Sequence, residues 1–309
     1  MQISQKKKIT AGLSVTSNVF LSAIKIIAGY LSGSISIISE AIHSLSDCLA
    51  SFIALFSVVK SSKPADSDHP FGHGKYEDMS GFIEGLLIIL ASFYIIYEAT
   101  RKIIVPSYAY RESILGITVM LVAVVVNIIV SSLLFKTAHE ADSISLLADA
   151  EHLRTDVYSS FGVLLGLILI KITGYNIIDS FVAILVAMFI FKTGYNISKK
   201  TWENLLDHSL PAEDIKKIED IVSNFNNVVK LKKDSIRARK IGAVKDIDLI
   251  LQFPCETTIC DCHKICDEIE SQISAVFGTS TISIHSEPVC HDENCESECS
   301  NKTKALIKN

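Results

Sequence analysis

The sequence predicts an α-helical membrane protein, with a six-helix transmembrane domain followed by a small cytoplasmic α+β domain. Hydrophobic residues make up 49% of the 309 residues, and the long apolar runs lie between residues 10 and 200. The mean hydropathy is +0.37, which is high for a soluble protein. After Lys199 the composition becomes mixed and charged, which is typical of a boundary between two domains. We expect a transmembrane domain over residues 1–206, an α+β domain over 207–289 and a flexible, Cys-rich tail over 290–309.

Six segments are long and apolar enough to cross a bilayer, which requires about 20 residues. They cover roughly residues 10–32, 35–59, 77–101, 113–136, 143–171 and 177–198. The fifth is the least uniform, because polar residues occupy its first half. The first lacks a small-residue cleavage motif, so we interpret it as a retained span and not as a signal peptide.

Basic residues near the ends of the six segments predict the orientation of the chain. An even number of spans places both termini on one side. That side is flanked by Lys6, Lys7, Lys8, Lys60, Lys63, Lys75, Lys136, Lys199 and Lys200. The other side is flanked by Arg101, Lys102, Arg111 and Lys171. This bias favours cytoplasmic termini. We expect the protein to lie in the plasma (inner) membrane. Cytoplasmic thiols stay reduced, so we predict no disulfides. A net charge of −5 without a basic stripe argues against nucleic-acid binding.

The second and fifth segments each carry an imidazole and a carboxylate one helical turn apart. "SEAIHSLSD" contains His43 and Asp47, and "EHLRTD" contains His152 and Asp156. Each ionisable group at mid-bilayer costs roughly 2.5–3.5 kcal/mol. Two imidazoles and two carboxylates suit tetrahedral Zn²⁺, and the two carboxylates neutralise a divalent ion. The sequence therefore predicts a metal site between the two segments. The alternative is hydrogen bonding between helices.

Three further acids lie near these ligands, namely Glu40, Asp149 and Glu151. We interpret them as interhelical contacts or as residues near a water-filled cavity, and not as ligands.

At this point the sequence resembles the cation diffusion facilitator family of divalent-metal transporters. The resemblance rests on "GYLSGSISIISEAIHSLSDCLAS", "DSDHPFGHGKYE", "ADAEHLRTDVYSSFGVLLG" and "SIHSEP", and it covers nearly the whole chain. It implies a homodimer of six-span protomers in the lipid bilayer, each with a ferredoxin-like or metallochaperone-like cytoplasmic domain. It also implies metal export coupled to proton entry. By the resemblance the transport site is His43, Asp47, His152 and Asp156, and a His at position 43 resembles the zinc-preferring members.

The resemblance places a second metal site in the loop after the second segment, at Asp66, His69 and His73. Gly72 and Gly74 would let this loop turn tightly, so that the two histidines converge. Asp68 is a substitute ligand in this interpretation. The alternative is a polar loop whose histidines bind the backbone.

Beyond residue 208 the pattern predicts a helix, two strands, a helix and a strand. These elements cover residues 211–225, 228–242, 244–253, 257–277 and 280–288. By resemblance a binuclear, regulatory Zn²⁺ site falls on Asp234, His263, His285 and Glu287. The sequence departs from the family at two positions. Asp234 stands where some members have His, and Ile250 replaces a residue that is a ligand in some members. The occupancy of the second metal position is therefore left open.

Two unusual Cys-rich stretches do not match a CxxC…CxxC zinc ribbon. "CDCHKIC" contains Cys260, Cys262 and Cys266, and "CHDENCESEC" contains Cys290, Cys295 and Cys299. Reduced thiols at such spacings bind Zn²⁺ or softer ions, but they also occur as incidental thiols in polar tails. Both interpretations stay open.

Taken together, these features predict a transporter, not an enzyme, that exports Zn²⁺ from the cytoplasm by antiport with protons. Fe²⁺, Cd²⁺, Co²⁺ and Mn²⁺ remain alternative ions, whereas imidazole ligands disfavour Mg²⁺. Another alternative is a membrane metal sensor or scaffold, which binds without flux. A metal-dependent enzyme needs an open coordination position, which four protein ligands do not leave. The sequence contains no GxxxxGK[ST] loop, which argues against an ATP-driven pump.

Overall fold

A computed structural model describes residues 3–32, 35–104, 114–173, 177–226, 229–232 and 234–289. The predicted Cys-rich tail therefore lies outside the described residues. Several side chains inside the described helices, among them those of residues 35–43 and 162–173, are outside the description as well. The chain divides into two compact units, Met1–Leu206 and Asp207–Asn309, which we describe separately.

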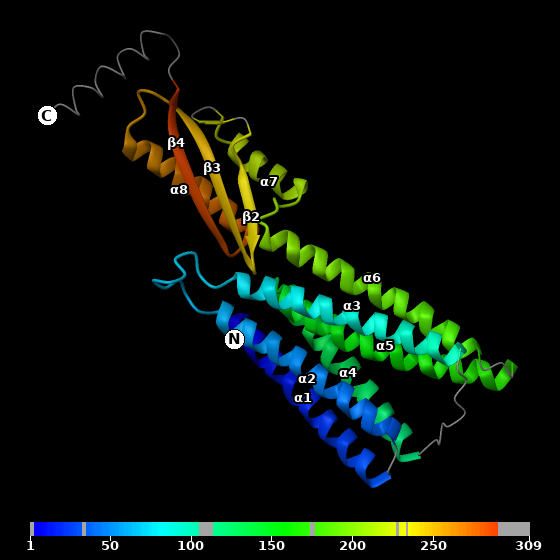
Figure 1. The fold of residues 1–309 in the computed structure, drawn as a ribbon. Coiled ribbons are helices and arrows are strands. Elements are labelled where there is room, and N and C mark those ends of the chain that lie inside the picture. The colour runs from blue at the N-terminus through cyan, green and yellow to red at the C-terminus, as the bar shows by residue number, and fades with distance from the viewer. Residues whose placement is uncertain are drawn as a thin grey trace. The chain divides into compact units, whose positions relative to one another are not determined.

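The first unit consists of long helices (Figure 1). They are α1 (Ile3–Ser32), α2 (Ile35–Ser61), α3 (Lys75–Ile104), α4 (Ile114–Glu140), α5 (Ile144–Thr173) and α6 (Ile177–Leu205). A helix of this length spans about 40–45 Å, more than the hydrocarbon core. Over the described residues, Ile3–Ala28, Lys75–Arg101, Leu121–Glu140 and Ser180–Leu205 are long and apolar enough to cross a membrane. Within the described residues, α2 and α5, which carry the candidate ligands, do not contain a segment of this kind. The count of six spans therefore stays a prediction.

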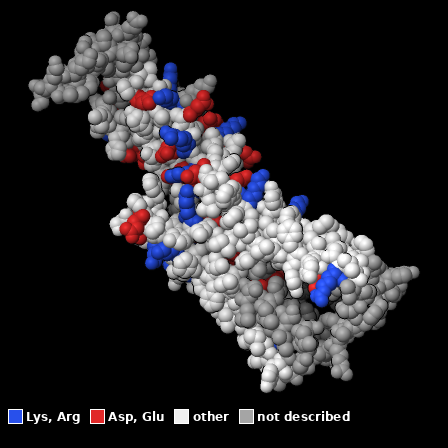
Figure 2. Space-filling model, in the orientation of Figure 1, with Lys and Arg blue, Asp and Glu red and all other residues white. Residues whose placement is uncertain are grey.

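The helices of this unit bury small and aliphatic side chains between them and expose large apolar ones. α3 packs most extensively on α6, α1 on α2, and α4 on α5. One core cluster joins α1, α2, α4 and α5 through Ala11, Val58, Val130, Leu134, Ala138, Leu146, Ala150 and Leu153. Outward-facing residues include Phe20, Phe52, Phe56, Leu90, Phe93 and Leu185. On the face shown in Figure 2, charged side chains are sparse over most of this unit. Such an apolar exterior is typical of a surface that contacts membrane.

Small residues bring α3 and α6 unusually close together. A Cβ atom on Gly85 would clash with Ser198 Oγ and would lie 2.9 Å from the Ser198 backbone nitrogen. A Cβ atom on Gly81 would lie 2.8 Å from the Thr201 methyl group. Small side chains at such a contact allow the backbones of membrane helices to approach.

We therefore expect Gly85→Ala to destabilise the protein, because the added methyl group must push α3 away from α6. Overpacking of this kind costs roughly 1–3 kcal/mol. The matched control is Gly12→Ala in α1, where a Cβ atom meets nothing within 4 Å. The thermal unfolding midpoint in detergent measures both variants. Equal midpoints for the two would contradict the close packing.

The second unit is a small sheet covered by two helices (Figure 1). Its elements are α7 (Ala212–Ser223), β1 (Lys230–Leu231), β2 (Arg237–Ile241), β3 (Val244–Pro254), α8 (Ile259–Phe277) and β4 (Ser280–Val289). β4 pairs with β3 in parallel, while β1 and β2 pair with β3 antiparallel. Alternate residues of β3 are buried, as expected for a strand with one core face. These residues, Ile247, Leu249, Leu251 and Phe253, share one core cluster with Ile218, Val222, Ile269 and Ile273 of the two helices.

One predicted strand of this unit is wrong in detail. The segment 228–242 forms two strands, β1 and β2, and not one. Between them Asp234 has a φ of +56°, and the Ser235 amide donates to the Lys232 carbonyl over 3.3 Å. A left-handed residue breaks the pleat of a strand. The αββαβ order otherwise holds, because β1 and β2 pair with successive parts of β3.

Candidate metal centre

The described bundle brings together three of the four predicted transport ligands. Asp47 lies on α2, whereas His152 and Asp156 lie on α5, one turn apart and so on one face. One ligand atom from each of the three lies within 4.8 Å of the other two. His152 Nε2 is 3.3 Å from Asp47 Oδ1. Bonds of about 2.0–2.2 Å to a tetrahedral ion separate its ligand atoms by about 3.3–3.6 Å, so this spacing fits such an ion.

This group is shielded from solvent. The His152 and Asp47 side chains are 8% and 7% exposed, and Asp156 is half-buried. His152 Nε2 faces Asp47 Oδ1, whereas His152 Nδ1 has no hydrogen-bond partner within the described part of the chain. Buried imidazole nitrogens normally have one. An arrangement of buried carboxylates around such an imidazole is well suited to hold a cation.

The fourth predicted ligand is His43. The structure places it in α2, one turn before Asp47 and hence on the same face of that helix. Its side chain lies outside the described residues. Ligation by His43 therefore stays a prediction.

A buried lysine near this group was missed by the sequence reasoning. Lys25 of α1 is 8% exposed, and its Nζ donates to Ser44 Oγ over 2.6 Å. Ser44 precedes Asp47 on α2 by about one turn. The missed signal is a single lysine within the apolar run "FLSAIKIIAGYL", to which the cost of burying charge applies equally.

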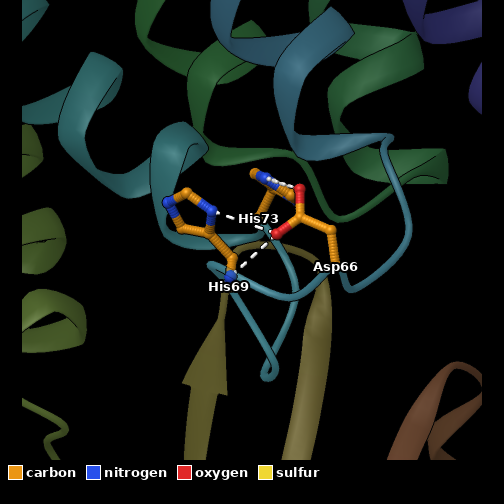
Figure 3. A group of neighbouring side chains, drawn as sticks. All are labelled: Asp66, His69 and His73. Carbon is orange, nitrogen blue, oxygen red and sulfur yellow. Dashed lines mark hydrogen bonds and ion pairs between the residues drawn. The ribbon is translucent and has the colours of Figure 1, made fainter.

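The loop between α2 and α3 gathers the second predicted group (Figure 3). Asp66 lies between the two imidazoles. Its Oδ1 is 3.3 Å from His69 Nδ1, and its Oδ2 is 3.3 Å from His73 Nε2. The two rings are 4.4 Å apart between centroids. Gly72 turns the loop with a φ of +82°, as predicted, and Gly74 leads directly into α3.

Hydrogen bonds hold this carboxylate in its charged form. The His69 backbone N–H donates to Asp66 Oδ1 over 2.8 Å, and this bond lowers the pKa of Asp66. The nearby imidazoles of His69 and His73 lower the pKa further. Asp66 and His69 are exposed, while His73 is buried. The group thus offers an ionised carboxylate and two ring nitrogens to an ion that approaches from the solvent-exposed side of Asp66 and His69.

We expect Asp66→Asn to remove one bound metal ion per protomer, because it removes the charge of the group and keeps an oxygen that can accept the His69 N–H. Isothermal titration with Zn²⁺ measures the stoichiometry. The control is Asp220→Asn, an exposed acid of α7 that belongs to neither described metal group. An unchanged stoichiometry in Asp66→Asn would rule out this loop as a metal site.

The four residues predicted for the cytoplasmic site do not form a cluster within the described residues. Lys232 Nζ donates to both Glu287 oxygens over 2.9 Å, and this contact lowers the pKa of Glu287. His263 is exposed and pairs with Asp267 at 3.5 Å. Asp234 and His285 are exposed as well. Ligation by these four residues stays a prediction.

The α8 thiols lie beside a pocket of about 440 Å³ that Glu287 also lines. The Sγ atom of Cys262 lies 3.2 Å from Ser286 Oγ, and the Sγ atom of Cys266 lies 3.7 Å from the same oxygen. Burial raises the pKa of Cys266. Metal binding by these thiols and hydrogen bonding as ordinary reduced thiols both stay open. Cys290, Cys295 and Cys299 lie outside the described residues.

Comparison with known proteins agrees with both units. The family described as cation efflux transmembrane domain matches residues 12–206, and the cation efflux protein cytoplasmic domain matches residues 210–289. An uncharacterized transporter of Methanocaldococcus jannaschii is 31% identical over 88% of this chain and 95% of its own length.

Two named relatives come from bacteria. The cation-efflux pump FieF of Shewanella oneidensis is 27% identical over 91% of this chain and 94% of its own length. The manganese efflux system protein MneP of Bacillus subtilis is 29% identical over 93% of this chain and 97% of its own length. The two family matches together span most of the chain, from the first helix to the end of the sheet. The chain therefore belongs to the cation diffusion facilitator family of divalent metal cation efflux transporters.

Proposed function

We propose that the protein exports Zn²⁺ from the cytoplasm across the plasma membrane in exchange for protons. The observation that carries the proposal is the buried contact between His152 Nε2 and Asp47 Oδ1, with Asp156 beside it. With His43 as fourth ligand, the set has two imidazoles and two carboxylates. In this proposal the protein is a transporter and not an enzyme, since no coordination position remains for a reactive water.

The choice of Zn²⁺ rests on the ligand types and their spacing. Imidazole and carboxylate together favour borderline ions over hard ones, and four ligands suit the tetrahedral geometry of Zn²⁺. The name of one relative specifies manganese, whereas the name of another specifies only cation efflux. The transported ion must therefore be identified by comparing the flux of several metals. Fe²⁺, Cd²⁺, Co²⁺ and Mn²⁺ are the competing candidates.

Proton exchange follows from the same chemistry. Imidazole and carboxylate must be deprotonated to bind a metal, so protons and metal compete for one set of atoms. Protons that enter from the outer side would therefore favour release there. We further propose that both termini are cytoplasmic, as the lysine bias favours, and that the protein is a homodimer. The cytoplasmic family domain over residues 210–289 is the part expected to pair.

The test is metal flux in liposomes that contain the purified protein. A pH gradient is imposed, and the entry of Zn²⁺, Fe²⁺, Cd²⁺, Co²⁺ and Mn²⁺ is recorded with a trapped fluorescent indicator. We expect Zn²⁺ to be carried with the highest kcat/KM and its flux to fall when the gradient is collapsed. Stoichiometric Zn²⁺ binding without flux of any ion would favour the sensor or scaffold.

A further inference from the structure

Two acids lie fully buried in the bundle outside the three-residue group. Glu84 of α3 and Asp149 of α5 are both 0% exposed. Each is within electrostatic reach of His152, and Asp149 also acts electrostatically on Glu84. The sequence reasoning did not single out Glu84. It is the charged residue of the otherwise apolar run "GFIEGLLIIL".

Each of the two acids uses one oxygen and leaves the other without a hydrogen bond. Ser80 donates to Glu84 Oε1 over 2.8 Å, and Ser51 donates to Asp149 Oδ1 over 3.0 Å. Glu84 Oε2 and Asp149 Oδ2 have no hydrogen-bond partner within the described residues. His152 acts on both acids and Asp149 acts on Glu84, and no described Lys or Arg is among the groups that act on them. Ser80 of α3 meets Ser145 of α5, and Glu84 and Asp149 each follow one turn later on these two helices.

Such a pair must take up either a proton or another positive charge. Burying a carboxylate costs several kcal/mol even after the protein relaxes, and two neighbouring carboxylates disfavour each other's charge. A lysine or arginine is the usual source of positive charge, but His152 is the only basic side chain among the described groups that act on the pair. A divalent cation would satisfy both charges at once, and both unpartnered oxygens are hard donors that accept one.

A hydrogen-bonded row of serines connects Glu84 with one end of the bundle. Ser80 Oγ lies 3.0 Å from Ser145 Oγ, and Ser145 Oγ lies 2.8 Å from Ser57 Oγ. All three are buried. Ser145 stands at the start of α5 and Ser57 near the end of α2. In the proposed orientation this is the cytoplasmic end.

Asp149 lies on the same helix as His152, about one turn nearer to that end. Buried polar groups therefore continue from the helix ends to the three-residue group of Asp47, His152 and Asp156.

We propose that Glu84 and Asp149 form an oxygen-only station that takes up the divalent cation on its way from the cytoplasmic end to the His/Asp site. The proposal rests on the proposed function. Carboxylate and hydroxyl oxygens bind a partly hydrated ion and exchange it readily, whereas the imidazole-containing site favours borderline metals. The station would thus speed the loading of the deeper site without setting its equilibrium affinity.

The test compares Glu84→Gln and Asp149→Asn with the parent. Both changes keep the shape and an acceptor oxygen and remove the charge. The matched control is Glu98→Gln on the same helix, where the half-buried Glu98 faces Arg101 at 3.7 Å. Zn²⁺ affinity is measured in detergent by competition with a chelator, and kcat/KM from initial flux in liposomes. We expect kcat/KM to fall about tenfold or more in each variant, while the affinity changes less than about threefold and the control matches the parent.

Several outcomes would overturn the station. If the parent transports Zn²⁺ and both variants keep the parental kcat/KM, the station does not exist, while the proposed function still holds. An affinity loss equal to the loss of kcat/KM would make the acids part of the deeper site. Loss of gradient dependence at unchanged kcat/KM would make them proton carriers. A parent without flux of any ion would overturn the proposed function and the station together.

Discussion

Replacing Asp47 by asparagine should lower Zn²⁺ flux by about a hundredfold or more while the protein stays folded. The change keeps the size of the side chain but removes one of the two carboxylate charges described around His152. Changes to groups that merely support a metal ligand cost about 10–100-fold in metal affinity or activity. The loss of a charged ligand in a buried site should therefore reach at least the upper end of that range.

Flux in liposomes and equilibrium binding in detergent measure this prediction together. Asp156→Asn should behave in the same way, since its carboxylate completes the described group. The control is Asp142→Asn, in the turn between α4 and α5. Asp142 has a φ of +46°, a conformation that asparagine also adopts readily. If the Asp47→Asn variant kept at least half of the parental flux, Asp47 would not be a ligand of the transport site.

The parts of the fold that follow from local pattern could be predicted from the sequence. Each apolar run lies within one helix of the first unit, because the cost of exposing backbone polar groups in lipid favours helices. The helical period likewise placed His152 and Asp156 on one face. Helix ends were less accurate: α1 begins at Ile3, because the lysines that precede its apolar run are helical as well.

Features that depend on partners distant in the sequence could not be predicted in this way. No local pattern indicates that Lys232 donates to both oxygens of Glu287, or that Ser80 of α3 meets Ser145 of α5, one turn before Glu84 and Asp149. The break between β1 and β2 depends on the left-handed conformation of Asp234, which is uncommon for residues other than glycine and is not indicated by the local sequence. The loop group was easier, because Asp66, His69 and His73 are near neighbours in sequence and Gly72 signals the turn.

A second large effect is expected where α1, α2, α3 and α5 meet. Glu77 near the start of α3 accepts from Lys7 Nζ and from Ser61 Oγ on one oxygen, and from Ser143 Oγ on the other. The Lys7 and Glu77 side chains are 8% and 2% exposed. Ser143 directly precedes α5, so this buried ion pair joins helices that are far apart in sequence.

Glu77→Gln should therefore destabilise the protein by about 3–5 kcal/mol, because it leaves the Lys7 ammonium buried without a counter-charge. For a unit of this size that corresponds to a fall of about 6–20 °C in the unfolding midpoint. The adjacent lysine supplies the control. Lys6 pairs with Glu140 at the surface, with side chains 37% and 44% exposed, and an exposed pair contributes about 0–1 kcal/mol. Glu140→Gln should thus shift the midpoint little.

The double variant Lys7→Met with Glu77→Met separates the loss of the pair from the stranded charge. Replacing a buried ion pair by apolar side chains of similar volume is often neutral or stabilising, whereas removing one partner is not. We expect the double variant to recover most of the midpoint that Glu77→Gln loses, as followed by size-exclusion chromatography after heating. Equal falls in Glu77→Gln and Glu140→Gln would show that the burial of Lys7 does not matter. Failure of the double variant to recover would instead assign the loss to the Ser61 and Ser143 hydrogen bonds, which only the Glu77 carboxylate can accept together.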